Sequence, residues 1–225
     1  MQTKIITMLR LQQKLNDDTN GTGWEKGVTD KGKPIDWYRC ALLECAETID
    51  SYPWKHWKSI DADPDYANIK IEAVDIWHFV LSMALAREPH KDDKTYETLA
   101  QSFITVPNFD AFVRGEHPSR DIYEQIETIE TLMRTLLCDR DLTAILQAFY
   151  DVTMQSDLDL DSLYALYIGK NILNAFRQDH GYKEGAYIKV WNGKEDNEVM
   201  QTILNEHPDI TPETLYQELE THYPA

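Results

Sequence analysis

Two pairs of acidic residues stand inside otherwise apolar stretches of the sequence. Glu44 and Glu47 lie in CALLECAETID, and Glu72 and Asp75 lie in IKIEAVDIWHF. Because residues three apart share a helix face, each pair projects from one side of its helix. If these helices are antiparallel neighbours, four carboxylates meet in a low-dielectric environment, where unpaired anions are strongly unfavourable. The acids must then take up protons, pair with basic groups or bind divalent cations.

All-oxygen ligands of this kind favour the hard cations Mg²⁺ and Mn²⁺. Two or more such ions on paired helices can bind phosphate groups and activate a water molecule. Two other interpretations stay open from the residues alone. The acids can instead form the solvated face of a helical interaction protein. Asp75 and His78, three residues apart, also resemble one half of a di-iron carboxylate site, although His78 is equally consistent with a buried core histidine.

A basic and aromatic segment lies far downstream of the acids. Between residues 170 and 194 there are five Lys or Arg residues against two Asp or Glu residues, in a chain of net charge −17. Lys170, Asn174 and Arg177 share one stripe of a helix, since they are four and three residues apart. Lys and Arg neutralise phosphate oxygens, and Asn donates an amide hydrogen bond. The segment either binds phosphate or pairs with acids of its own chain.

The elements that must position these residues are predicted to be helices. Apolar periodicity covers residues 3–17, 36–50, 66–87, 94–105, 120–137, 140–155 and 159–178. Residues 106–119 are expected to be a connector and 182–197 to hold short extended pieces, before one or two terminal helices with a start at TPET, 211–214. Because strand signals are weak, we predict an all-α helical bundle with paired acid-bearing helices.

Length and composition limit the remaining possibilities. The 225 residues suit a single domain over 1–225, with a core bundle from roughly 1–87 and 120–180 and a smaller mobile helical part. The net charge of −17 argues against a nucleic-acid partner. Three cysteines without a framework spacing indicate a reducing compartment. With neither a signal peptide nor an apolar run long enough to span a bilayer, we expect a cytoplasmic protein without a membrane partner.

Both acid pairs, together with the block YIGKNILNAFRQDHGYKEGAYIKVWNGKEDN at 167–197, resemble the dimeric all-α dUTPases. These belong to the wider all-α NTP pyrophosphohydrolases, which share the paired acid motifs, so the acids alone also suit a related enzyme with another nucleotide substrate. The resemblance implies a homodimer that hydrolyses dUTP to dUMP and diphosphate, accepts dUDP and limits uracil incorporation into DNA. It implies two or more Mg²⁺ ions, with Mn²⁺ as an alternative.

The same resemblance assigns roles to individual residues. Glu44, Glu47, Glu72 and Asp75 become the metal ligands, and one of the first pair, with Glu47 preferred to Glu44, orients or deprotonates the attacking water. The residues expected to hold phosphates are Lys170, Asn174, Arg177, Tyr182, Lys183, Lys189 and Asn197. Those expected at the uracil base are Gln13, Asn16 and Trp57. Amide side chains suit uracil, which presents two carbonyl acceptors and one N–H donor.

Overall fold

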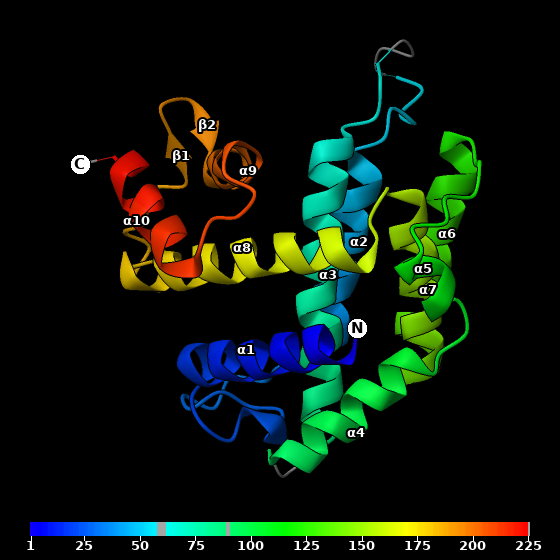
Figure 1. Ribbon diagram of the computed structural model, residues 1–225, viewed down its shortest axis with the longest axis horizontal. Helices are drawn as coiled ribbons and strands as arrows, with labels where there is room; N and C mark the ends of the chain where they lie inside the picture. Colours follow the sequence, from blue (N-terminus) through cyan, green and yellow to red (C-terminus); the bar gives the residue numbers. More distant parts are fainter. Residues whose placement is uncertain (58–61, 89–90, 225) are drawn as a thin grey trace. The chain divides into compact units, whose positions relative to one another are not determined.

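The computed structural model describes residues 1–57, 62–88 and 91–224. It divides the chain into two compact units, Met1–Leu163 and Tyr164–Ala225. Nearly all regular structure in the described residues is helical (Figure 1), which confirms the predicted all-α class. The single-domain organisation stays a prediction. None of the helices in the described ranges has the length and apolar character that crossing a membrane would require.

Helices in the first unit largely follow the predicted ranges. In chain order they are α1 Gln2–Asn20, the 3₁₀ turn η1 Trp24–Lys26, α2 Trp37–Asp50, α3 Tyr66–Ala86, α4 Asp93–Ile104, α5 Phe109–Val113, α6 Ile122–Arg134, the π-turn η2 Thr135–Asp139, α7 Leu142–Gln155 and the start of α8 Leu160–Asp179. Aspartates fix several of these starts. Asp36, Asp65 and Asp92 each accept a hydrogen bond from a backbone N–H of the first turn of α2, α3 and α4, as N-cap residues do.

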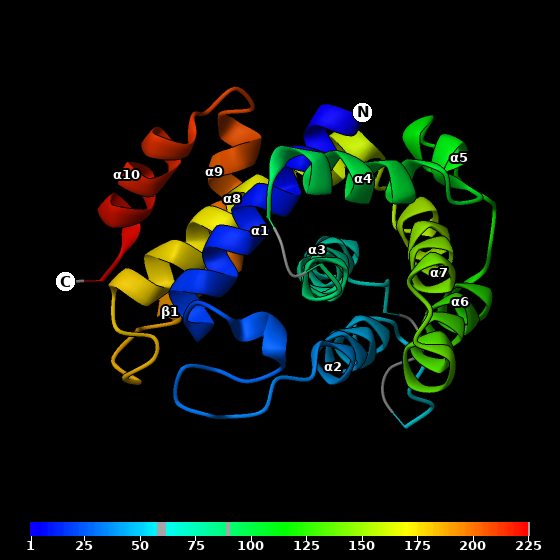
Figure 2. The same ribbon diagram turned by 90° about the horizontal axis from the view of Figure 1, so that it is seen from below.

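The long helix α3 is the centre of the first unit. It packs against α1, α2 and α7, and Figure 2 looks along it and shows these helices around it. Its apolar residues, among them Ile71, Val74 and Trp77, lie on every face and are buried, as expected for a helix that is hydrophobic all round. The two acids of α3 are therefore carried on the most enclosed element of the unit.

Two segments of the first unit differ from the sequence prediction. The predicted connector 106–119 is wrong at α5, where Phe109 and Phe112 are buried. The Phe112 ring stacks on Tyr150 of α7 with 5.0 Å between the ring centroids, so tertiary packing orders a segment too short to be stable alone. The second difference is at the end of α6, where regular α-helix stops at Arg134 and a π-turn follows.

The second unit contains the rest of α8, a hairpin and two terminal helices. Strands β1 Val190–Trp191 and β2 Lys194–Glu195 pair antiparallel, and both residues of the connecting Asn192–Gly193 turn have positive φ, as a type I′ turn requires. Helices α9 Asp196–Glu206 and α10 Pro212–His222 complete the unit. The start of α10 confirms the TPET prediction, because Thr211 accepts a hydrogen bond from the Thr214 backbone N–H.

Candidate active site

Packing of α2 against α3 brings three of the four predicted acids together. Carboxylate oxygens of Glu44, Glu72 and Asp75 all lie within 4.8 Å of one another. Glu72 is 8% exposed, whereas Glu44 and Asp75 are partly buried. Glu47 is exposed and lies outside this group of three. The spacing and the all-oxygen donor set fit one hard divalent cation, so the residues present suit the metal that the sequence implied.

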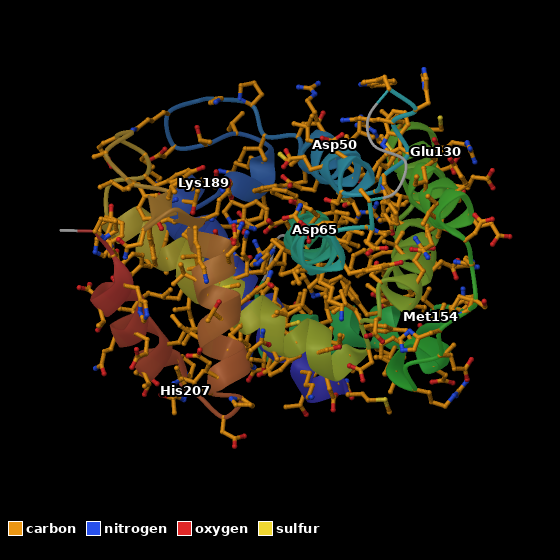
Figure 3. The ribbon with its side chains drawn as sticks, turned by 90° about the horizontal axis from the view of Figure 1, so that it is seen from above. Asp50, Asp65, Glu130, Met154, Lys189 and His207 are labelled. Carbon is orange, nitrogen blue, oxygen red and sulfur yellow. The ribbon has the colours of Figure 1, made fainter. Side chains whose placement is uncertain are left out.

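A pocket of about 450 Å³ lies beside this acid cluster. It is lined by residues at the end of α2, at the start of α3 and, between the two helices, at 51–53 and 62–65, and Figure 3 shows Asp50 and Asp65 at this same end of the helix pair. Its acidic lining residues are Glu47, Asp50, Asp63, Asp65 and Glu72. Glu47 therefore faces the same pocket as Glu72. A pocket lined by so many carboxylates attracts cations and, without them, repels a phosphate chain.

The electrostatics of the acid cluster show how strongly it needs a positive partner. Burial, together with the negative charges of Asp75, Glu72 and Glu47, raises the pKa of Glu44 from 4.5 to about 8. A hydrogen bond between the carboxyl groups of Glu44 and Glu72 acts in the same direction, because it requires a proton on one of them. The cluster therefore holds a proton near neutral pH unless a cation takes its place.

Neighbouring polar residues fix the orientation of Glu72. The Asn68 side-chain amide nitrogen donates hydrogen bonds to Glu72 Oε1 at 3.1 Å and to Ser51 Oγ at 2.9 Å. Asn68 is itself placed by Asp65, which accepts a hydrogen bond from its backbone N–H. Outer-shell partners of this kind set the direction in which a ligating carboxylate points. Sequence reasoning did not identify Asn68, although its position four residues before Glu72 places it on the same helix face.

The two predicted uracil residues on α1 are buried and hydrogen-bonded in two separate groups. Asn16 donates a hydrogen bond to Ser82 Oγ of α3 and accepts one from Gln12, which also donates to Ser82. Gln13 is 8% exposed, and its amide nitrogen donates to Asp17 and Glu25 at 3.0 Å each. Its Oε1 is buried and accepts no hydrogen bond from any described residue. Buried polar atoms are normally satisfied, so this oxygen is available for a ligand.

Trp57, the third predicted uracil residue, lies in the segment after α2. It is 63% exposed, and its ring makes edge contacts with the rings of Trp54 and His56, with centroids 5.9 and 4.9 Å away. The structure brings Gln13 and Asn16 together on one helix, while Trp57 is exposed on another segment. An exposed indole is free to stack on a planar ligand.

His78 belongs to the hydrogen-bonded group of Asn16 and not to the acid cluster. Its Nδ1 lies 2.7 Å from Gln12 Oε1, and the ring is buried. Within the described ranges, the residues grouped as possible metal ligands are Glu44, Glu72 and Asp75, without His78. The core-histidine interpretation is thus favoured over a di-iron ligand.

Four of the predicted phosphate residues meet in the second unit. Arg177 forms hydrogen bonds through Nε and Nη2 to the two oxygens of Asp196, each at 2.8 Å. It also donates to Asn174 Oδ1 at 3.1 Å, and Lys170 Nζ donates to Asn197 Oδ1 at 2.8 Å. The structure therefore groups Lys170, Asn174, Arg177 and Asn197 around a carboxylate of the same chain.

The central carboxylate of that group, Asp196, was not identified from the sequence. It is 0% exposed and also accepts a hydrogen bond from the Tyr187 hydroxyl at 2.8 Å. Although burial by itself would raise its pKa, the Arg177 guanidinium and the Tyr187 hydroxyl hold the pKa of Asp196 below the usual 3.8. Its only sequence signal was its place in KEDN, next to the predicted Asn197.

The other predicted phosphate residues lie nearer the surface of the second unit. The Arg177 guanidinium carbon is 6.0 Å from the centroid of the half-exposed Tyr182 ring. Lys183 is exposed. Lys189 forms an ion pair with Glu195 at 3.0 Å, with both side chains about half exposed. All three residues are exposed to solvent.

Comparison with known proteins identifies a family. The model of the dUTPase family matches residues 4–182, and no match was found among curated proteins. The matched range covers well over half of the chain and includes all four predicted metal ligands, the predicted uracil residues and Arg177. It ends before Lys183, Lys189 and Asn197. The chain therefore belongs to the dUTPase family, as its acid pairs and downstream block predicted, and is a dUTP diphosphatase.

Proposed function

We propose that this protein hydrolyses dUTP to dUMP and diphosphate, and dUDP to dUMP and phosphate, with Mg²⁺ bound by Glu44, Glu47, Glu72 and Asp75. The observation that carries the proposal is the convergence of Glu44, Glu72 and Asp75 within 4.8 Å beside an acidic pocket. Carboxylates this close need cations to be stable in the ionised form. The three converging acids suit one Mg²⁺ ion, and Glu47 at the same pocket suits a second or further ion; Mn²⁺ has the same ligand preference.

The acids have different tasks in this proposal. When bound, the divalent ions supply positive charge to the phosphate oxygens and lower the pKa of a bound water molecule. Glu47 is exposed at the pocket, where it can orient that water and accept its proton as a general base. The more enclosed Glu72, oriented by Asn68, serves as a ligand and not as a base. Glu44, whose carboxyl group lies near Glu47 and Glu72, is a ligand and the alternative general base.

Base recognition is proposed for Gln13, Asn16 and Trp57. The buried Oε1 of Gln13 suits the single N–H donor on the uracil edge, and the exposed Trp57 ring suits stacking on the base. A fit that excludes the methyl group of thymine would contribute about 1–3 kcal/mol of discrimination. A base with the wrong donors leaves buried polar atoms unpaired and is rejected more strongly.

Phosphate binding is proposed for the cationic residues of the second unit. Lys170, Asn174, Arg177 and Asn197 supply donors that are already grouped. Tyr182, Lys183 and Lys189 add donors nearer the surface. We further propose that the protein is a cytoplasmic homodimer that limits uracil incorporation into DNA. The resemblance of the acid pairs and the 167–197 block to the dimeric all-α dUTPases supports the homodimer, and the free thiols Cys40, Cys45 and Cys138 suit a reducing compartment.

Substrate profiling tests this proposal. Purified protein with Mg²⁺ is expected to release diphosphate from dUTP and phosphate from dUDP, and to leave dTTP and dCTP largely intact. Glu47→Gln is expected to abolish turnover without loss of helix content by circular dichroism. Glu97→Gln, at an exposed position of α4, is the matched control. Preference for another nucleotide would indicate a related pyrophosphohydrolase, and near-normal activity of Glu47→Gln would remove Glu47 from the mechanism.

A further inference from the structure

The carboxamide of Gln13 is fixed in one orientation by two carboxylates. We propose that Asp17 and Glu25 are specificity-determining positioning residues, which hold Gln13 so that its oxygen, and not its NH₂ group, is presented to the base. Their role is to reject cytosine in favour of uracil. This inference rests on the proposed function, because it assumes that Gln13 contacts the base.

The hydrogen bonds of Gln13 determine the positions of its amide nitrogen and its amide oxygen. Its nitrogen donates to Asp17 Oδ1 and to Glu25 Oε1, at 3.0 Å in both cases. An amide nitrogen has two hydrogens, so both are used by carboxylate oxygens. Ionised carboxylates accept hydrogen bonds and do not donate them. The network therefore assigns the nitrogen to the side of the acids and Oε1 to the other side.

The two carboxylates are themselves held in place. Asp17 Oδ1 accepts a second hydrogen bond, from the indole N–H of Trp24 at 3.2 Å. Trp24 is buried and makes an edge contact with Trp37, with 5.6 Å between ring centroids. Glu25 Oε1 lies 3.7 Å from Lys91 Nζ. The acids come from α1 and η1, which pack against each other, so neither can turn away from Gln13 without losing a partner.

Rotating the amide by half a turn would be strongly unfavourable. The carbonyl oxygen of Gln13 would then face two carboxylate oxygens, and both nitrogen hydrogens would lose ionised acceptors. Gln13 therefore presents a fixed acceptor, and this acceptor is buried without a partner in the described residues. Uracil and thymine carry a hydrogen at N3 that can satisfy it. Cytosine has a lone pair at N3, so the same contact places two acceptors against each other.

The double variant Asp17→Asn with Glu25→Gln tests this inference. Neutral amides in place of both acids can either accept from or donate to Gln13, so the orientation of its carboxamide is no longer imposed. The ratio of kcat/KM for dUTP over dCTP is expected to fall at least tenfold. The ratio for dUTP over dTTP is expected to change less than twofold, because thymine also carries the N3 hydrogen. A general loosening of the site would change both ratios.

Matched variants and a binding assay complete the test. Asp18→Asn removes the same charge from an exposed neighbour that pairs with Lys14, and should leave both ratios unchanged. The single variants Asp17→Asn and Glu25→Gln should each give a smaller loss, and they replace the double variant if it does not fold. Calorimetry with dUMP and dCMP should show the same loss of preference without turnover.

The outcomes separate this inference from the proposed function. A wild-type protein that neither prefers dUTP over dCTP nor binds dUMP better than dCMP would overturn the proposed function itself. A wild-type preference that survives unchanged in the double variant, or in both single variants, would overturn only the positioning role of Asp17 and Glu25. A parallel fall of the dTTP ratio would assign these acids a structural role instead.

Discussion

Replacing Glu44 by Gln should make the metal-free protein more stable at alkaline pH. In the metal-free state the Glu44 carboxylate is partly buried and crowded by Glu72 and Asp75, and a neutral amide of the same shape removes both the cost of burying its charge and that repulsion. The carboxyl pKa is 4.5 in its ordinary state and about 8 in the folded protein. Between these values the folded state binds more protons than the unfolded state, so its stability falls as pH rises.

The size of the effect follows from the same two values. The rise of the Glu44 pKa from 4.5 to about 8 corresponds to a free energy of unfolding that is lower by about 5 kcal/mol above pH 8, at about 1.4 kcal/mol for each pKa unit. Because Glu44 is only partly buried and salt screens its neighbours, we expect about 2 kcal/mol in practice. For a chain of this length, that equals an increase in Tm of about 4–8 °C for Glu44→Gln at pH 8.5.

Thermal unfolding with a chelator present measures this difference directly. Wild type, Glu44→Gln and the surface control Glu97→Gln are compared at pH 5 and pH 8.5. At pH 5 the variant is expected to be only slightly more stable than wild type, because most of the stability that the wild type loses through Glu44 is lost between pH 5 and pH 8. With saturating Mg²⁺ at pH 8.5 the order should reverse, since the ion stabilises the wild type and a variant that has lost a ligand gains less.

Two results would refute this reasoning. If Glu44→Gln is no more stable than wild type in chelator at pH 8.5, the charge of Glu44 does not destabilise the metal-free fold. If it gains the same stability at both pH values, the gain comes from packing and not from charge. Glu97→Gln should change Tm by no more than about 1–2 °C, as surface substitutions usually do.

Three further predictions follow from contacts in the two units. Asn68→Ala removes the donor that orients Glu72 and should weaken Mn²⁺ binding about 10–100-fold, measured by electron paramagnetic resonance of free Mn²⁺; unchanged binding would leave Asn68 without this role. Asp196→Asn leaves the Arg177 guanidinium without its buried anion and should lower the free energy of unfolding in urea by about 3–5 kcal/mol. The control is Glu195→Gln, which removes the exposed ion pair with Lys189 and should cost less than about 1 kcal/mol. Phe112→Ala should lower the free energy of unfolding by about 3–5 kcal/mol, because it removes the buried ring that stacks on Tyr150. A near-neutral change would mean that α5 is not part of the core.

Helices and acid pairs could be predicted because their signals are local. Asp36 and Asp65 precede apolar periodic stretches, and both cap helices. The convergence of Glu44 with Glu72 and Asp75 followed from two i, i+3 pairs on neighbouring helices. These inferences needed only the geometry of a helix and the assumption that α2 and α3 are paired.

Contacts between distant residues could not be predicted in the same way. The pairing of Arg177 with Asp196 joins residues 19 apart, and nothing in the pattern of either segment selects that acid over its neighbours. The α5 helix depends on Tyr150, from a helix that follows later in the chain. The fixed amide of Gln13 depends on Glu25, which lies beyond a glycine-rich turn. Each of these features is set by tertiary packing, which periodicity does not encode.

The buried network between α1 and α3 has a consequence for the geometry of catalysis. Gln12 and Asn16 on α1 are joined to Ser82 on α3 by directional bonds, and Gln12 also contacts His78, one turn beyond Asp75. Apolar packing alone would let one helix slide along the other by a fraction of a turn, whereas these bonds permit a single register. The distance from the proposed base-binding residues to the proposed metal ligands is thus built into the folded chain before any nucleotide arrives, so a nucleotide must match a spacing that it does not set.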